Sequence, residues 1–149
     1  MSQRPGVGCG AAILRNGRIS LVERRTAPEA GHWNLPGGKV DFLEPVEAAI
    51  VREIHEEVGL DIALGPLLCV TQMIGIDGQH WVSPIHSAVI VAGEPINREP
   101  DKIGAIGWFV LDAPPSPLAQ GATDAIRALL VSSKSPEAAP KPAAGTAEP

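Results

Sequence analysis

The stretch GKVDFLEPVEAAIVREIHEEVGL, residues 38–60, decides the fold of this chain. Apolar residues recur in it at steps of three and four, a period that predicts a helix over residues 45–58. Pro45 suits the first turn of such a helix, and Gly59 suits its C-terminal end. The side chains expected on the buried face are Val46, Ala49, Ile50, Ile54 and Val58.

Glu53, Glu56 and Glu57 share one face of the predicted helix, because positions i, i+3 and i+4 span an arc of about 100°. Their like charges repel, so either the face is solvated or a cation offsets the repulsion. A hard divalent ion such as Mg²⁺ prefers carboxylate oxygens and keeps waters and substrate phosphates as further ligands. The preceding glycine pair, together with Glu44 and the guanidinium of Arg52, favours the metal-binding interpretation.

The same stretch resembles the signature of the Nudix hydrolases, G-x5-E-x7-R-E-U-x-E-E-x-G-U, where U is a bulky aliphatic residue. Every fixed position is matched, and the looser resemblance covers residues 7–131. One departure is Leu43, where most members have glycine before the first glutamate of the signature. The matching residues are Gly38, Glu44, Arg52, Glu53, Ile54, Glu56, Glu57, Gly59 and Leu60.

The resemblance implies a role for each matched residue. Glu53, Glu56 and Glu57 would bind the metal, and the backbone carbonyl of Gly37 would complete its protein ligands. A second group would orient these carboxylates or shape the loop and the helix end. That group consists of Arg52, which acts with the catalytic glutamates, and of Glu44, Gly38 and Gly59.

The resemblance also implies the reaction. The family cleaves a nucleoside diphosphate linked to another moiety: water attacks a phosphorus of the pyrophosphate while divalent ions neutralise the developing charge. Residues 79–109 resemble mutator-type members, which suggests an NTP or dNTP, oxidised or not, as substrate and the monophosphate plus pyrophosphate as products. The alternatives are ADP-ribose or a nucleotide sugar, then a diadenosine polyphosphate, or a non-catalytic nucleotide sensor. Mg²⁺ is the expected cofactor, replaceable by Mn²⁺, and a homodimer is the expected assembly.

Substrate-binding residues and the general base are sought outside the signature. One of Arg24 and Arg25, at the end of a predicted strand, would contact phosphate, since only one of them can face a cleft. Lys39 is a second candidate for a phosphate contact, and Trp33 either stacks on a base or fills the core. The resemblance implies that the general base is either a glutamate of the signature or a carboxylate on a later loop. Glu99, in the acidic loop of residues 97–102, is the residue expected for this role, with a solvated turn as the alternative.

The rest of the chain reads mainly as strands. Asn16–Gly17 and Asp77–Gly78 predict two-residue hairpin turns, because these residues accept positive φ angles. Strands and helices in the order ββ-α-β-β-β-α predict an α/β (α+β) fold with a mixed sheet sandwiched between helices. The other expected elements are strands over 8–14, 18–23, 67–76, 81–92 and 103–111 and a helix over 120–131.

The composition sets outer limits on function. With 149 residues the chain suits one domain, expected over 7–131, preceded by a short extension (1–6) and followed by a disordered Ala/Pro-rich tail (132–149). A net charge of −5 argues against binding to nucleic-acid polymers or anionic membranes. No apolar run approaches the roughly 18 residues of a membrane span, and no signal peptide is recognisable. Two cysteines without metal spacing are expected to be reduced, which indicates a cytoplasmic protein.

Overall fold

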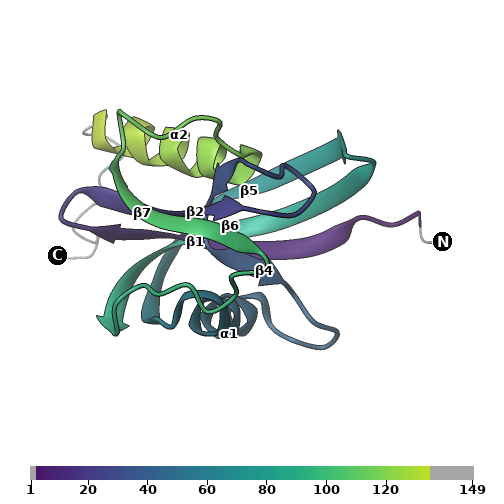
Figure 1. Ribbon diagram of the computed structural model, residues 1–149, viewed down its shortest axis with the longest axis horizontal. Coiled ribbons are helices and arrows are strands. Elements are labelled where there is room, and N and C mark those ends of the chain that lie inside the picture. Colours follow the sequence, from purple (N-terminus) through teal and green to yellow (C-terminus); the bar gives the residue numbers. More distant parts are fainter. Residues whose placement is uncertain (1–2, 135–149) are drawn as a thin grey trace, which may run out of the picture.

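The computed structural model describes residues 3–134, and residues 1–2 and 135–149 lie outside the described part. Within it the chain forms a sheet with one helix on each side (Figure 1). The elements are β1 (Gly6–Arg15), β2 (Arg18–Arg24), β3 (Trp33–Asn34), β4 (Gly37–Lys39), α1 (Val46–Val58), β5 (Asp61–Ile76), β6 (Gln79–Ala92), β7 (Ile103–Val110) and α2 (Gln120–Lys134).

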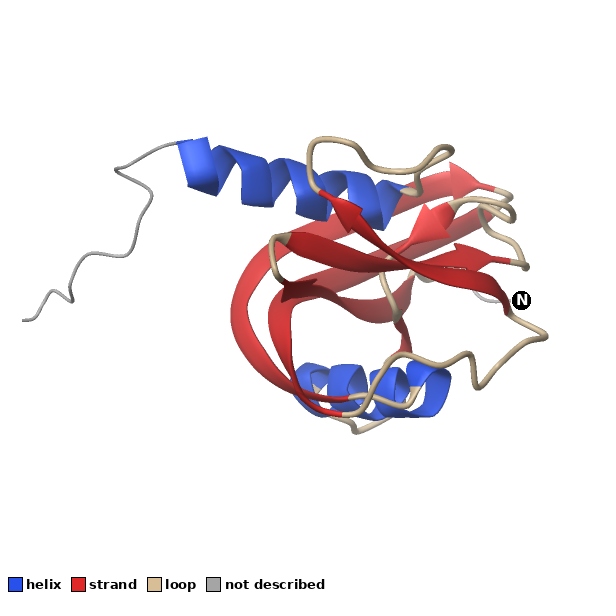
Figure 2. Ribbon diagram, turned by 60° about the vertical axis from the view of Figure 1, so that its left-hand side comes forward, coloured by secondary structure: helices blue, strands red, loops and turns tan. Residues whose placement is uncertain are grey.

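The sheet is mixed, as the sequence predicts. Its main strand order is β3-β2-β1-β6-β5, with β4 added to β1 and β7 added to β2. β1 and β6 are parallel, and the remaining pairs are antiparallel. Figure 2 shows the strands between the two helices, so the predicted sandwich of a mixed sheet between helices is confirmed.

Both predicted hairpin turns are present. Asn16 and Gly17 have φ angles of 53° and 76°, and Asp77 and Gly78 have φ angles of 52° and 72°. Two successive positive φ angles give a turn whose twist matches that of the flanking strands. The second turn therefore joins β5 to β6 as one long hairpin, with Ile76 paired to Gln79 at its tip.

A hydrophobic cluster lies under each helix. The cluster beneath α1 includes the four buried side chains of that helix, as the period of its sequence predicts: Ala49, Ile50, Ile54 and Val58. The cluster beneath α2 combines β1, β2 and α2 through Ala12, Ile19, Leu21, Ala122, Ala125 and Ile126. The two faces of the sheet are thus covered independently, and each helix is held by its own apolar stripe.

Most elements lie within two residues of their predicted bounds, and the larger differences have physical reasons. β5 begins at Asp61 instead of residue 67, because the strand continues through Gly65 and Pro66 and its pairing register shifts between Leu64 and Leu67. β3 lies inside a predicted loop, since two residues are too few to give a sequence period. α2 continues to Lys134, so the first three residues of the predicted tail are helical, and 135–149 are outside the described residues.

Within residues 3–134, neither helix has the length and apolar content needed to cross a membrane. Cys9 and Cys69 are free thiols, and burial raises the pKa of both, that of Cys9 to about 11. A thiol with a raised pKa forms little thiolate near neutrality, so both cysteines act as packing residues.

Candidate functional site

The helix α1 is fixed at both ends by residues that the sequence marks. Pro45 precedes its first residue, and Gly59 ends it in a left-handed conformation (φ 72°), donating its N–H to the carbonyl of His55. The buried apolar stripe of the helix sets its rotation about its own axis. Glu53 and Glu57 consequently face the sheet side where β4 approaches, while Glu56 is turned toward solvent and is 49% exposed.

Arg52 ties three of the carboxylates together. Its Nε and Nη2 donate to the two oxygens of Glu44 at 2.7 and 2.9 Å, and its Nη1 lies 3.2 Å from both Glu53 and Glu56. The bidentate bond from Arg52 holds the pKa of Glu44 down at about 2, helped by the backbone N–H of Asp41. Arg52 therefore contacts Glu44, Glu53 and Glu56 at the same time.

The glycine pair 37–38 lets the backbone of β4 touch the carboxylates. The N–H of Gly37 donates to Glu57 Oε1 at 3.0 Å, and that of Lys39 donates to Glu53 Oε2 at 3.4 Å. A methyl group on Gly37 would collide with the carbonyl of Cys9, and one on Gly38 would collide with the Glu53 carboxylate. Glycine is required at position 37, where the methyl group would meet backbone atoms, whereas at position 38 a methyl group would push the Glu53 carboxylate out of its place.

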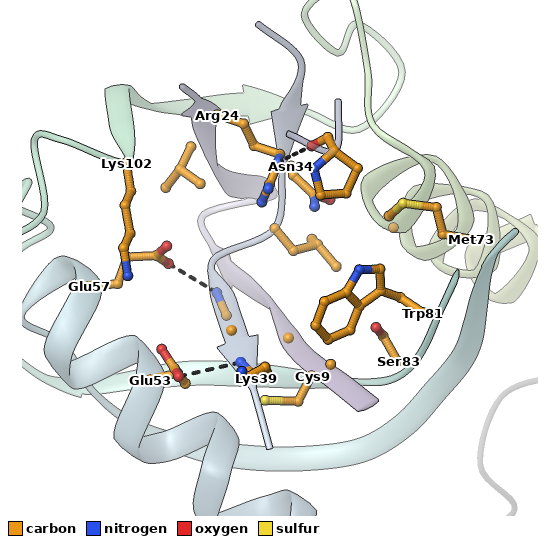
Figure 3. A pocket seen from close by; sticks show the side chains of 18 of the residues that line it. Cys9, Arg24, Asn34, Lys39, Glu53, Glu57, Met73, Trp81, Ser83 and Lys102 are labelled. Carbon is orange, nitrogen blue, oxygen red and sulfur yellow. Dashed lines mark hydrogen bonds between the residues drawn. The ribbon is translucent and has the colours of Figure 1, made fainter. Parts of the chain in front are cut away.

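These groups open into a cavity of about 450 Å³ (Figure 3). We call one part of it the carboxylate end; it contains Glu53, Glu57, Glu99, Arg24, Lys39 and Lys102. Burial raises the pKa of Glu57 to about 8, and repulsion from Glu99 and Glu53 adds to the rise. An additional positive charge at this end would thus favour the ionised form of Glu57.

Glu99 reaches the cavity because its loop is bound to the end of α1. The N–H of Arg98 donates to the carbonyl of Glu57 at 3.0 Å. Within the loop, Asn97 accepts the N–H of Glu99, and the carbonyl of Glu99 accepts the N–H of Lys102. The loop is therefore an ordered turn that carries Glu99 and Lys102 into the same cavity as Glu57.

The donor chemistry at the carboxylate end fits a hard divalent cation such as Mg²⁺ or Mn²⁺. Glu53 and Glu57 supply carboxylate oxygens, and the like charges around Glu57 would be relieved by a cation. Within residues 3–134, however, no three His, Cys, Asp or Glu side chains gather around one point as a complete ligand set. Glu56 is the expected ligand that stands apart, because it does not line the cavity and is held by Arg52.

We call the opposite part the hairpin end, because most of its residues come from β5 and β6. Figure 3 shows Met73, Trp81 and Ser83 across the cavity from Glu53 and Glu57. Met73 and Trp81 are directly paired across the two strands, and Trp81 Nε1 donates to Gln79 Oε1 at 2.8 Å. The hairpin end is lined by Asn34, Thr71, Met73, Gln79, Trp81 and Ser83.

Asn34 enters this end with a fixed orientation. Its Oδ1 accepts the N–H of Ala122 in the first turn of α2 at 3.1 Å, which leaves its Nδ2 as the polar atom available to the cavity. The sequence interpretation missed Asn34, Met73, Trp81 and Lys102. For Met73 and Trp81 a signal existed, since residues 71, 73, 81 and 83 share one face of a two-residue period.

Of the expected substrate-binding residues, Arg24 and Lys39 line the cavity, whereas Arg25 and Trp33 do not. Arg24 Nε donates to the carbonyl of Pro28 at 2.7 Å, whereas Arg25 follows the end of β2 and its side chain lies against Gly104 of β7. Trp33 packs edge-on against Phe109, with ring centroids 5.1 Å apart, in the cluster beneath α2. The base-stacking role considered for Trp33 is therefore wrong, and its alternative as a core residue holds.

Comparison with known proteins gives one consistent result. A family model described as the NUDIX domain matches residues 3–129. The crystal structure of a MutT NUDIX hydrolase from Burkholderia pseudomallei superposes with a TM-score of 0.79 and 53% sequence identity, covering 85% of this chain and 99% of that one.

Two curated relatives match over part of their length. The ADP-ribose pyrophosphatase of Methanocaldococcus jannaschii is 36% identical over 91 residues, which are 60% of this chain and 54% of that protein. The CTP pyrophosphohydrolase of Escherichia coli is 41% identical over 56 residues, which are 37% of this chain and 42% of that protein. The matches thus span about half of these relatives or less.

Proposed function

This chain belongs to the Nudix hydrolase family, and we propose that it hydrolyses a nucleoside or deoxynucleoside triphosphate, oxidised forms included, to the monophosphate and pyrophosphate. The observation that carries the proposal is that one cavity joins two chemically different ends. The carboxylate end suits a metal-bound polyphosphate, because it combines acidic ligands with Arg24, Lys39 and Lys102. The hairpin end suits a base, because Met73 and Trp81 offer a broad apolar surface.

The residues at the carboxylate end would divide the work of hydrolysis. Glu53 and Glu57, joined by Glu56 from the same turn of α1 as the resemblance implies, would hold Mg²⁺, which would supply charge stabilisation at the phosphorus under attack. Glu99 would accept the proton of the attacking water, whose oxygen forms the new bond to phosphorus as the P–O bond of the anhydride breaks. The electron pair of the broken bond leaves with the departing group, which is pyrophosphate when water attacks the α-phosphorus and the nucleoside monophosphate when water attacks the β-phosphorus.

The cationic side chains would bind and orient the substrate. Arg24 already donates to Pro28 through Nε, so its terminal nitrogens remain to contact a phosphate oxygen. Lys102 is held beside Glu99 by the turn of residues 97–102 and would neutralise the departing phosphate. Lys39 follows the glycine pair and lines the same part of the cavity.

A second candidate substrate is ADP-ribose or another nucleotide sugar. The relative from Methanocaldococcus jannaschii, named an ADP-ribose pyrophosphatase, favours it. In that case the hairpin end would still take the adenine, and the sugar phosphate would leave from the carboxylate end. The two candidates differ in the product, since only the triphosphate releases inorganic pyrophosphate.

The test is a screen for release of pyrophosphate and phosphate with Mg²⁺ over NTPs, oxidised dNTPs, ADP-ribose and dinucleoside polyphosphates. The variant Glu53→Gln removes a carboxylate from the cavity, and Glu47→Gln on the solvent side of α1 is the matched control. We expect one class of nucleoside triphosphate to give pyrophosphate with wild type and Glu47→Gln but not with Glu53→Gln. Turnover that persists in excess EDTA would refute the proposed mechanism.

A further inference from the structure

Glu29 is an acidic residue that the proposed reaction does not use and that the protein nevertheless buries. It lies in the loop between β2 and β3 and is 9% exposed. Its backbone has a φ of 61°, a left-handed conformation that is uncommon outside glycine and asparagine. Its Oε1 atom is buried without a hydrogen-bond partner among residues 3–134. Both features cost stability, so packing alone does not explain the residue.

Glu29 joins its loop to two distant segments of the chain. Its backbone N–H donates to Oδ2 of Asp77, at the tip of the β5–β6 hairpin, over 3.0 Å. Its Oε2 accepts the N–H of Gln120, the first residue of α2, also over 3.0 Å. The N–H groups of a first helical turn lack partners within the helix, and a carboxylate is well suited to them.

All three joined segments line the cavity. The loop contributes Thr26, Ala27 and Pro28, the hairpin contributes Met73 and Trp81, and α2 contributes a glycine that follows Gln120 directly. None of these segments is paired with residues 25–32 as a strand. The backbone of Glu29 binds the side chain of Asp77 and its side chain binds the backbone of Gln120, so the two bonds tie the loop to both segments.

The same loop also holds one of the cationic residues. Arg24 donates through Nε to the carbonyl of Pro28, the residue before Glu29. The backbone of Arg24 closes the loop, since its N–H donates to His32 and its carbonyl accepts from Gly31. Arg24 is thus tied to its loop by three bonds that do not use the Glu29 carboxylate, so loss of that carboxylate would move the walls of the hairpin end and leave Arg24 in place.

We propose that Glu29 is a positioning residue that sets the width of the hairpin end and thereby the affinity of the enzyme for the nucleoside part of its substrate. The inference rests on the proposed function, since it assumes that a nucleoside occupies that end. Glu29 touches neither the carboxylates nor the attacking water. Its loss should weaken substrate binding and leave the chemical step intact.

The experiment compares variants that keep the backbone conformation. Glu29→Gly removes the carboxylate and tolerates the positive φ, and Asp77→Gly removes the second bond while it preserves the hairpin turn. Glu29→Gln retains an oxygen that can accept the N–H of Gln120 and serves as the conservative variant. Glu94→Gly is the control, because it removes a carboxylate that pairs with Arg15 outside the cavity.

We expect Glu29→Gly to raise KM for the nucleotide about tenfold, the equivalent of one lost hydrogen bond to a charged group, with kcat changed less than about threefold. The inhibition constant of the nucleoside monophosphate should rise in parallel, whereas that of pyrophosphate should not. Asp77→Gly should also raise KM. The rise in KM of the double variant should be smaller than the product of the two single-variant factors. Glu29→Gln should restore most of the affinity.

If Glu29 only stabilises the fold by capping α2, Glu29→Gly should have a lower melting temperature and an unchanged KM. That result would overturn the proposal. An equal rise in the inhibition constants of monophosphate and pyrophosphate would also overturn it. Amide hydrogen exchange provides a test that does not need turnover. Exchange should accelerate in residues 25–31 and 75–80 of Glu29→Gly and stay at the wild-type rate in α1.

The experiments distinguish an error in the proposed hydrolysis from an error in the role proposed for Glu29. If wild type hydrolyses no nucleotide, the proposed function falls, and calorimetric titration with the nucleoside monophosphate then decides the role of Glu29. Weaker binding to Glu29→Gly than to Glu94→Gly supports the positioning role. Equal binding to both variants, or equal exchange rates, refutes it.

Discussion

The two ends of the cavity are built in opposite ways. The carboxylate end is built around one continuous stretch, in which β4 and α1 place Gly37, Glu53 and Glu57 against one another, while Arg24, Glu99 and Lys102 join it from β2 and the loop of residues 97–102. The hairpin end is assembled from β3, the β5–β6 hairpin, the loop before β3 and the first turn of α2. Short-range bonds hold the geometry of the first end, whereas the geometry of the second depends on the register of the whole sheet. The proposed metal ligands are therefore positioned by local structure, and the proposed base-binding walls by tertiary contacts.

The largest effect on activity is expected when a glutamate of the metal-binding group is replaced by its neutral amide. Glu57→Gln should lower kcat at least about 10²-fold, through loss of metal-based charge stabilisation. Glu56→Gln should have a similar effect, since the resemblance implies that Glu56 also binds the metal. Steady-state kinetics with saturating Mg²⁺ measures both, and Glu47→Gln on the same helix should retain wild-type turnover. Near-normal turnover in both variants would contradict the metal assignment.

The second prediction concerns the backbone of β4, whose N–H groups bind the carboxylates of α1. Gly37→Ala places a methyl group against the carbonyl of Cys9 and the Cα of Gly10, which are backbone atoms that cannot rotate away. We expect a loss of about 1–3 kcal/mol in the free energy of unfolding, as for other overpacked sites, together with loss of activity. Urea denaturation measures the first quantity. Gly17→Ala is no suitable control because of its positive φ, so Glu47→Gln on the exposed side of α1 provides the comparison and should change the free energy of unfolding by less than about 0.5 kcal/mol.

The hairpin end should respond to substitution in KM instead of kcat. Trp81→Ala removes the widest apolar surface of that end and should raise KM about tenfold, the size expected for a lost base–aromatic contact, with kcat nearly unchanged. Trp33→Phe, in the core beneath α2, should leave KM as in wild type. A fall in kcat for Trp81→Ala as large as that for Glu57→Gln would contradict the assignment of substrate binding to the hairpin end and of catalysis to the carboxylate end.

The same contrast explains what the sequence could predict. The period of residues 45–58 places Ile50 and Ile54 in the core and Glu53 and Glu57 on the cavity side, because a helix fixes these relations within four residues. The hairpin turns at Asn16–Gly17 and Asp77–Gly78 are likewise local. By contrast, the bond between Asn34 and Ala122 joins residues 88 positions apart, and no local pattern marks such a pair. The position of Trp33 depends equally on packing against Phe109, which only the assembled sheet decides.

The pairing of Glu44 with Arg52 gives the carboxylate end a dependence on pH. The folded state holds the pKa of Glu44 at about 2, below its usual value of 4.5. Between these two pH values the folded state therefore binds fewer protons at Glu44 than the unfolded state does. The stabilisation is therefore complete above the unfolded pKa and is lost as the pH falls from about 4.5 toward 2. Melting temperatures measured from pH 6 to pH 3 should fall more steeply for wild type than for Glu44→Gln. Parallel curves would show that Arg52 does not favour the ionised form.

The smallest expected effect lies in the turn that connects β4 to α1, at the edge of the carboxylate end. Leu43 has a left-handed φ of 67° and is 87% exposed, so its side chain gains little from packing while its backbone is strained. Leu43→Gly relieves the strain but increases the entropy of the unfolded chain, which leaves a net gain of about 0.5 kcal/mol or less. Scanning calorimetry should show a rise in melting temperature of about 1–2 °C, with unchanged kcat. Leu43→Ala keeps the strain and should show no rise; a lower melting temperature for Leu43→Gly than for Leu43→Ala would mean that the leucine side chain itself stabilises the turn.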